Sequence, residues 1–494
     1  MAKKELNLSE EFNSERIGTL GRKLSLVVKL SWPAIMAQLS TILMEYIDAS
    51  MVGRLGAGPA ASIGLMATTT WLFWGLGTAT ATGYAVQVAH LIGGNRDEEA
   101  KGVLRQSIIV VLGLAVVLAI IGLAISRHLP VWLGGNAEII EGSTSYFAIF
   151  AISLPMLFMS YLSASMLRCS GNMFIPGVLN VAMCVLDVIF NLLMIFPTRY
   201  VEILGIEFTM PGAGMGVTGA ALGTLFAEIV AGGYMFYYML YRSSRLRHPA
   251  RGVARWWSVT RNTVLRACKI SWPLAVERAV MCSAQILVTA IVAPLGTAAI
   301  AANSFGITAE GLCYMPGYGI SDASTTLVGQ SVGAGKRELA KSFGRITIIL
   351  GMLIMAVLGA VMWLFSADIM MFFTSDPEVI SLGSVALKTE AWAEPMFGAA
   401  IVTYGVFIGA GYTVTPAVIN FSCIWGVRVT LSLLLASSLG LFGVWLAMAI
   451  ELGVRGLTFI IVFVRGHWLQ KSIKITPEPL VAVQQIEQPD EFEL

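Results

Sequence analysis

Charged residues, histidine and cysteine are all scarce in this chain of 494 residues. Asp, Glu, Lys and Arg make up 13% of it, whereas about 25% is usual in soluble proteins, so a soluble globular protein is excluded. The formal net charge of +2 and the 4 histidines indicate neither a nucleic-acid partner nor a histidine-rich metal site. The 6 cysteines show no CxxC spacing, which argues against a zinc site or a disulfide framework. We therefore expect no cofactor.

Hydrophobic sequence is what the chain has in excess. Hydrophobic residues make up 56% of it, and the mean hydropathy is +0.76. A bilayer core needs about 20 apolar residues per helix, and twelve such segments follow one another along the chain. We predict an all-α integral membrane protein whose twelve transmembrane helices lie near residues 27–52, 60–84, 107–127, 145–167, 174–196, 214–241, 267–292, 299–324, 344–366, 383–410, 414–437 and 441–464.

Lysine and arginine gather in the loops that follow even-numbered spans. They occur at 96–105, at 242–269 and at 336–345, whereas the loop after the ninth span carries Asp368 and Asp376. Cytoplasmic loops are enriched in Lys and Arg, so both termini are predicted to face the cytoplasm and the protein to lie in the inner (plasma) membrane. The polar N-terminus shows no signal-peptide cleavage site, and the first span is expected to serve as its own insertion signal.

The sequence contains an internal duplication. The segment KLSWP at 29–33 recurs as KISWP at 269–273, an offset of 240 residues (269 minus 29). Identical residues at the same offset include Gly93 and Gly333, Lys101 and Lys341, Pro155 and Pro395, and Asn180 and Asn420. Because each copy holds six spans, both copies have the same orientation, which predicts two parallel six-helix bundles related by a pseudo-twofold axis along the membrane normal.

The duplication divides the chain into five regions. They are a cytoplasmic tail at 1–24, a first bundle at 25–241, a basic cytoplasmic linker at 242–266, a second bundle at 267–466 and a cytoplasmic tail at 467–494. The cleft between the bundles is the expected substrate site. An outer loop at 197–213, absent from the second copy, is expected either to cover the outer mouth or to form a passive hairpin.

Two aspartates in the first bundle have no counterpart in the second. Asp48 and Asp187 align with Val288 and Val427, so the fold itself does not require a carboxylate at either place. An aspartate at a helix centre costs about 2.5 to 3.5 kcal/mol on insertion scales and tends to mark a functional site. Glu45 shares a helix face with Asp48.

Polar residues continue along the fifth span. Asn180, Cys184, Asp187 and Asn191 recur at intervals of three or four residues, which places all of them on one helix face. We interpret this stripe as facing a cavity in the first bundle; the alternative is that the two acids are hydrogen-bonded for packing alone.

The second bundle carries its own ionisable residues within the spans. These groups either form buried ion pairs and hydrogen bonds, the commoner reason for their presence in a membrane, or line a substrate cavity. They are Glu277, Arg278, Glu310, Asp322, Glu390, Glu394 and Arg428.

Two six-helix halves, each opening with a Ser-Trp-Pro helix and then Leu-Gly, resemble the multidrug and toxic compound extrusion (MATE) transporters. The most characteristic stretches are VTGAALGT at 217–224 and VGQSVGAG at 328–335, and the resemblance covers residues 25–465. It implies a monomeric secondary antiporter, not an enzyme, that exports small organic and often cationic compounds in exchange for protons or sodium ions.

The resemblance also implies a cation-binding cavity in the first bundle, formed by Asp48, Asp187 and Thr224. Where the family pattern has an asparagine four residues before the second aspartate, this chain has Met183, so Asn180 or Asn191 would have to substitute. No metal is expected beyond a sodium ion at Asp48 and Asp187, and the missing asparagine disfavours sodium more than it disfavours a proton.

A lipid-linked saccharide flippase of related architecture is the alternative function. Such a protein is expected to have a strongly cationic central cavity, whereas acids outnumber arginines in the spans of this chain. Both functions stay open at this point.

Overall fold

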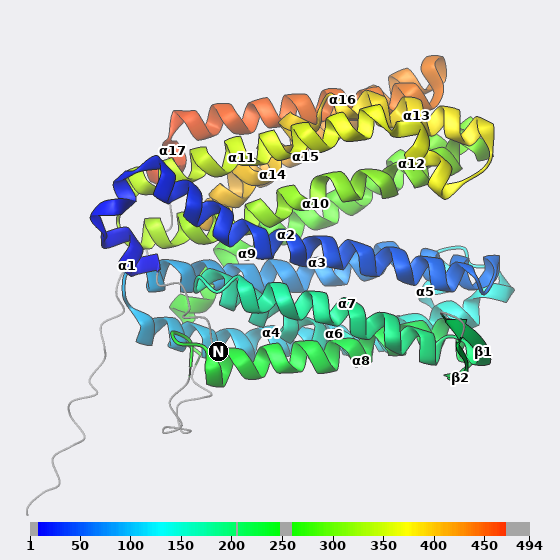
Figure 1. Cartoon of the computed structure of the whole chain (residues 1–494), viewed down its shortest axis with the longest axis horizontal. Coiled ribbons are helices and arrows are strands. Elements are labelled where there is room, and N and C mark those ends of the chain that lie inside the picture. The colour runs from blue at the N-terminus through cyan, green and yellow to red at the C-terminus, as the bar shows by residue number, and fades with distance from the viewer. Residues whose placement is uncertain (1–7, 204–205, 248–258, 471–494) are drawn as a thin grey trace, which may run out of the picture.

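The computed structural model describes residues 8–203, 206–247 and 259–470, so parts of the predicted linker and tails lie outside the described residues. Figure 1 shows long helices running side by side along the longest axis of the molecule. Helices α1 and α17 lie at one end of these rods, and α5, β1 and β2 lie at the other.

The first copy of the repeat contains helices up to α8 and one hairpin. Its elements are α1 (Leu8–Asn13), η1 (Glu15–Gly18), α2 (Leu20–Gly53), α3 (Ala57–Gly93), α4 (Asp97–Ile125), α5 (Leu129–Trp132), α6 (Ala137–Cys169), α7 (Phe174–Met194), β1 (Pro197–Ile203), β2 (Ile206–Ala213), α8 (Gly216–Tyr237) and η2 (Tyr238–Arg242).

In the described residues of the second copy every regular element is a helix. Its elements are α9 (Arg261–Val292), η4 (Ala293–Leu295), α10 (Thr297–Gly333), α11 (Arg337–Leu364), α12 (Ser366–Phe373), α13 (Pro377–Ala391), α14 (Glu394–Gly409), α15 (Val414–Cys423), η5 (Ile424–Val429), α16 (Thr430–Arg465) and α17 (His467–Gln470).

Eight helical segments in the described chain are long and apolar enough to cross a membrane, and the bent pair α13 and α14 makes a ninth. Helices α3 and α10, each 37 residues long, fall outside this group. Both are rich in Gly, Ala, Ser and Thr, small residues that allow helices in membranes to approach closely.

The structure corrects two expectations about individual elements and agrees with a third. The helix predicted at 383–410 is bent by 59° between α13 and α14: Pro395, in the first turn of α14, has no N–H for the carbonyl of Ala391, where α13 ends. The helices predicted at 414–437 and 441–464 meet at a kink at Gly440, where the backbone is not helical (φ 60°, ψ −141°). The chain is also not purely α-helical, because β1 and β2 pair antiparallel as a hairpin at 197–213.

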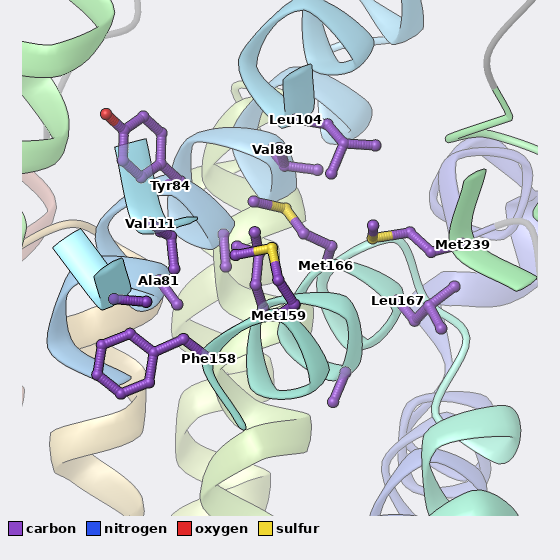
Figure 2. Close-up of a cluster of buried hydrophobic side chains, with 14 of the residues drawn as sticks. Ala81, Tyr84, Val88, Leu104, Val111, Phe158, Met159, Met166, Leu167 and Met239 are labelled. Atoms are coloured by element: carbon purple, nitrogen blue, oxygen red, sulfur yellow. The ribbon is translucent and has the colours of Figure 1, made fainter. Parts of the chain in front are cut away.

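Large side chains fill the interior of the first copy. Figure 2 shows side chains of α3, α4 and α6 gathered there, among them Val88 of α3, Leu104 of α4 and Met166 of α6, with Met239 of η2 nearby. Contacts between the copies run mainly along two helix pairs, α2 with α10 and α3 with α9. Each pair joins one helix of the first copy to one of the second.

Helices α3 and α10 cross at their C-terminal ends, and beside this crossing each one binds the last residue of a further helix in the other copy, α14 and α6, in a pattern that follows the repeat. His90 Nε2 donates to the Gly409 carbonyl, and its counterpart Gln330 donates to the Cys169 carbonyl, both at 2.7 Å. A Cβ on Gly93 would lie 2.0 Å from the Gln330 carbonyl oxygen. The copies are therefore in backbone contact at this end.

Candidate functional site

Asp48, Asp187 and Asn191 form one hydrogen-bonded cluster between α2 and α7. The amide nitrogen of Asn191 donates to an Asp48 carboxyl oxygen at 2.7 Å and to an Asp187 carboxyl oxygen at 2.9 Å. A side-chain amide has two N–H donors, so Asn191 uses one on each acid. The two carboxyl groups lie within reach of each other.

The cluster is closed off on the side of α7 and α8. Asp187 and Asn191 have no exposed surface, whereas Asp48 is half-buried. Thr224 on α8 lies beside Asp187, and its hydroxyl donates to the Ala220 carbonyl at 3.2 Å. The neighbouring Gly223 leaves room for Asn191, because a Cβ there would lie 2.0 Å from Asn191 Oδ1.

Two oxygens in this cluster accept no hydrogen bond from any described group. They are Asp187 Oδ1 and Asn191 Oδ1, both buried. Buried oxygens of native proteins almost always have a partner. With two carboxyl groups in contact and free oxygens beside them, the cluster has the chemistry to hold a proton or a small hard cation, which takes oxygen ligands.

The other first-copy residues predicted for the site lie at its edges. Asn180 is seven residues before Asp187, about 10 Å along α7, and among the described residues it makes no hydrogen bond to the cluster. Glu45 is exposed. Tyr146 of α6, which the sequence did not single out, lies close enough to Glu45, Asp48 and Asp187 to interact with them electrostatically.

Asn420, the repeat counterpart of Asn180, does bind an acid in the second copy. Its amide donates to Glu277 at 2.6 Å, and the Tyr404 hydroxyl donates to the other Glu277 oxygen at 2.6 Å. Position 277 corresponds to Ala37 in the first copy. Asn180 therefore has no acid at the equivalent place, which explains why it lies outside the cluster.

A second group of ionisable residues lies buried in the second copy. Glu310 of α10 is next to Glu390 of α13, and Arg428 and Arg455 are the nearby cations. Glu394 lies against the Cys313 thiol. Arg455 pairs with Glu451 at 3.0 Å, an i, i+4 pair on α16. This arrangement is a buried network of acids with two arginines.

The remaining predicted residues are separate from that network. Asp322 accepts a hydrogen bond from Gln38 of α2 at 3.1 Å and pairs with Arg168 of α6 at 3.9 Å, so it joins the two copies. Arg278 lies among tyrosines, Tyr161 and Tyr404 among them.

Sequence reasoning missed two partners of these acids. Tyr404 and Asn420 each donate a hydrogen bond to Glu277, an acid that the sequence did single out. The repeat could have indicated Asn420, because it occupies the same position in the second copy as Asn180, a member of the polar stripe, in the first. Nothing in the sequence pattern distinguishes Tyr404 from other membrane tyrosines.

Comparison with known proteins gives a family match in both copies of the repeat. A protein-family profile described as MatE matches residues 33–193 and 273–434. The chain is 25% identical over 450 residues to the "Probable multidrug resistance protein NorM" of Thermotoga maritima, covering 90% of this chain and 93% of that protein. It is 23% identical to the "Probable multidrug resistance protein YoeA" of Bacillus subtilis, covering 89% and 93%.

Solved structures share the fold. One, described as the outward-facing conformation of a multidrug resistance MATE family transporter, gives a TM-score of 0.83 at 20% identity, over 91% of this chain and 97% of that one. A transporter of the MOP superfamily from Pyrococcus furiosus gives 0.82 at 19% identity, over 91% and 97%.

Proposed function

The chain belongs to the MatE family, whose members are membrane transporters rather than enzymes, and from this premise we propose that it is a multidrug efflux antiporter. It exports organic, often cationic compounds in exchange for protons or sodium ions. The observation that carries the exchange is the pair of carboxyl groups bridged by Asn191.

The architecture that we propose has twelve spans in two bundles. Six spans in each copy result when the long helices α3 and α10 are counted as spans, α13 with α14 as one span, and the run from Val414 to Arg465 as two that meet at Gly440. Packing of α2, α7 and α8 in the first copy, and of α10, α11 and α14 in the second, supports this grouping. Both termini then face the cytoplasm, at the end marked by α1 and α17 in Figure 1.

The coupling step takes place at Asp48 and Asp187. Two carboxylates in contact repel each other, so the site is stable only with a proton or another cation present. A proton needs one oxygen, whereas a sodium ion requires several oxygen ligands. The candidate ligands for sodium are Asp187 Oδ1, Asn191 Oδ1 and the Thr224 hydroxyl.

Helix α2 connects this site to the second copy. Two residues before Asp48, the Tyr46 hydroxyl donates to the Thr308 carbonyl of α10, and Gln38 donates to Asp322 of the same helix. Loading and unloading of the cation changes the charge between α2 and α7, and α2 transmits the change to α10. The cation thereby shifts the equilibrium between inward-open and outward-open states. In this scheme the acids of the second copy form a structural network.

The decisive test is ethidium or norfloxacin efflux from loaded cells under separately imposed proton and sodium gradients. We expect Asp48→Asn and Asp187→Asn to abolish gradient-driven export while the protein still inserts into the membrane. Asp368→Asn, the same change at an exposed position of α12, should leave export unchanged. The gradient that drives export in the parent protein identifies the coupling ion.

Export that persists in both aspartate variants would reject the coupling site. A protein that moves lipid-linked saccharides and no drug would reject multidrug efflux in favour of the flippase.

A further inference from the structure

A groove on the outside of the second copy combines apolar walls with a single lysine. It has a volume of about 580 Å³ and is lined by α11, α13, α14 and α16, among other residues by Trp363, Lys388, Trp392, Met396 and Gly453. We refer to it as the α13 groove. It lies where α13 and α14 bend by 59°.

The surfaces beside the α13 groove face lipid. Val357 and Leu364 of α11 are 64% exposed, and Trp392 is 78% exposed. Exposed apolar side chains at this density on a helix long enough to cross a membrane are expected at the bilayer.

Lys388 is the cation of the α13 groove. Its ammonium lies 5.9 Å from the centre of the Trp363 ring, within range of a cation–π contact, which extends to about 6 Å. In the described part of the chain no acidic side chain pairs with Lys388. An ammonium at the edge of the hydrocarbon is stabilised by a counter-charge, and in this groove such an anion would come from outside the described chain.

The depth of Lys388 in the membrane identifies that anion. Arg345 and Trp363 are 18 residues apart on α11 (363 minus 345), about 27 Å at 1.5 Å per residue, close to the roughly 30 Å of a hydrocarbon core. With Arg345 at the cytoplasmic boundary, as the proposed function places it, Trp363 and Lys388 lie at the outer boundary. Lipid phosphates begin there, and Trp side chains are enriched at this depth.

We propose that the α13 groove binds one anionic phospholipid of the outer leaflet. Its phosphate contacts the Lys388 ammonium, and an acyl chain runs past Trp392 and Met396 towards the bilayer centre. Lys388 lies on α13 and Met396 on α14, on either side of the 59° bend, so the acyl chain would follow the groove around this bend. Gly453 forms the floor, since a Cβ there would meet no atom within 4 Å.

Native mass spectrometry of the purified full chain tests the proposal, with phosphatidylglycerol or phosphatidylcholine added to the detergent. The parent protein should retain phosphatidylglycerol in preference to phosphatidylcholine. Lys388→Gln should weaken retention of phosphatidylglycerol about tenfold, equivalent to about 1.4 kcal/mol, whereas Lys388→Arg, which keeps the charge, should retain it.

Gly453→Leu should reduce the retention of both lipids, because its side chain fills the floor of the groove. Gly113→Leu on α4 is the matched control: a Cβ there also meets nothing within 4 Å, and retention should be unchanged. Parent-level retention of phosphatidylglycerol by Lys388→Gln or by Gly453→Leu would overturn the proposal. The proposal would also be overturned if the mass spectra showed a dimer that dissociates when lipid is added, because a second copy of the chain would then be the occupant of the groove. Lipid retention is measured without transport, so its failure leaves the coupling site untouched.

Discussion

Asn191 holds two acids with one amide group, and this makes it the residue on which the candidate coupling site depends most. Both of its N–H donors are used, one on Asp48 and one on Asp187. In the second copy the counterpart of Asn191 is Leu431, and the counterparts of Asp48 and Asp187 are Val288 and Val427. The first copy therefore has the amide and both acids, and the second copy has none of the three.

Replacing Asn191 with leucine should uncouple transport. Asn191→Leu leaves the buried Asp187 and the half-buried Asp48 without their shared donor, and a buried group left unsatisfied costs about 1 to 3 kcal/mol. We expect gradient-driven efflux to fall by about tenfold or more, the effect of at least 1.4 kcal/mol. Asn180→Leu on the same face of α7 is the control and should retain export, since Asn180 lies outside the cluster. An equal loss of export in Asn191→Leu and Asn180→Leu would mean that the whole polar face of α7 is required, and would contradict the special role of Asn191.

Gly223 should tolerate no side chain. In Gly223→Ala the new Cβ would lie 2.0 Å from Asn191 Oδ1, so the amide or α8 has to move. Overpacking of this kind costs about 1 to 3 kcal/mol, and we expect a lower midpoint in a thermal unfolding scan of the purified protein. Gly113→Ala, with open space around its Cβ, should have an unchanged or higher midpoint. A parent-like midpoint for Gly223→Ala would mean that the cluster is loosely packed.

At the scale of helices, the sequence predicted which segments are helical better than where the helices end or how they bend. Each predicted span lies mostly within a helical stretch, but α3 and α10 continue nine residues beyond their predicted ends, from 84 to 93 and from 324 to 333. The chain bends near Pro395, yet Pro155 at the same register of the repeat lies inside the unbroken α6. Neighbouring helices decide which proline becomes a break, and the sequence alone does not contain that information.

The crossing of α3 and α10 yields a prediction for a pair of helices. Gln330→Ala removes the hydrogen bond to the Cys169 carbonyl, which contributes about 1 kcal/mol. The crossing should then open about fivefold more often. In a variant whose only cysteine is the buried Cys169, maleimide labelling should accelerate by that factor.

His90→Gln is the control for this crossing. It places the repeat counterpart of Gln330 at position 90 and keeps a donor for the Gly409 carbonyl, so Cys169 labelling should stay at the parent rate. Acceleration in His90→Gln but not in Gln330→Ala would show that the two bonds are not equivalent.

At the scale of the whole molecule, the repeat was the most informative feature of the sequence. It predicted the two matched blocks of the family profile and singled out Asp48 and Asp187, which meet at Asn191. It did not reveal the contacts across the copies, such as Asp322 with Gln38. Those contacts depend on how the copies dock, and docking has no local sequence signal.

Helix α1 provides a test of how the two copies move. It packs on α3 of the first copy and on α10 of the second. Phe12 is 2% exposed and lies 5.7 Å from the Phe343 ring, centroid to centroid. The Lys336 ammonium donates to the Phe12 carbonyl at 2.6 Å. If the copies separate at this end during transport, α1 must release one of them.

Phe12→Ala should therefore favour the state that is open at the α1 end. Losing about 2 kcal/mol of apolar burial changes a two-state ratio by about thirtyfold, which would appear as faster maleimide labelling of Cys169. Leu20→Ala, at a side chain that is 68% exposed, is the control and should label at the parent rate. Unchanged labelling in Phe12→Ala together with a lower unfolding midpoint would mean that α1 stabilises the fold without holding the two copies together. If α1 did hold the copies together, weakening its contact with the second copy would have to change the access of maleimide to Cys169.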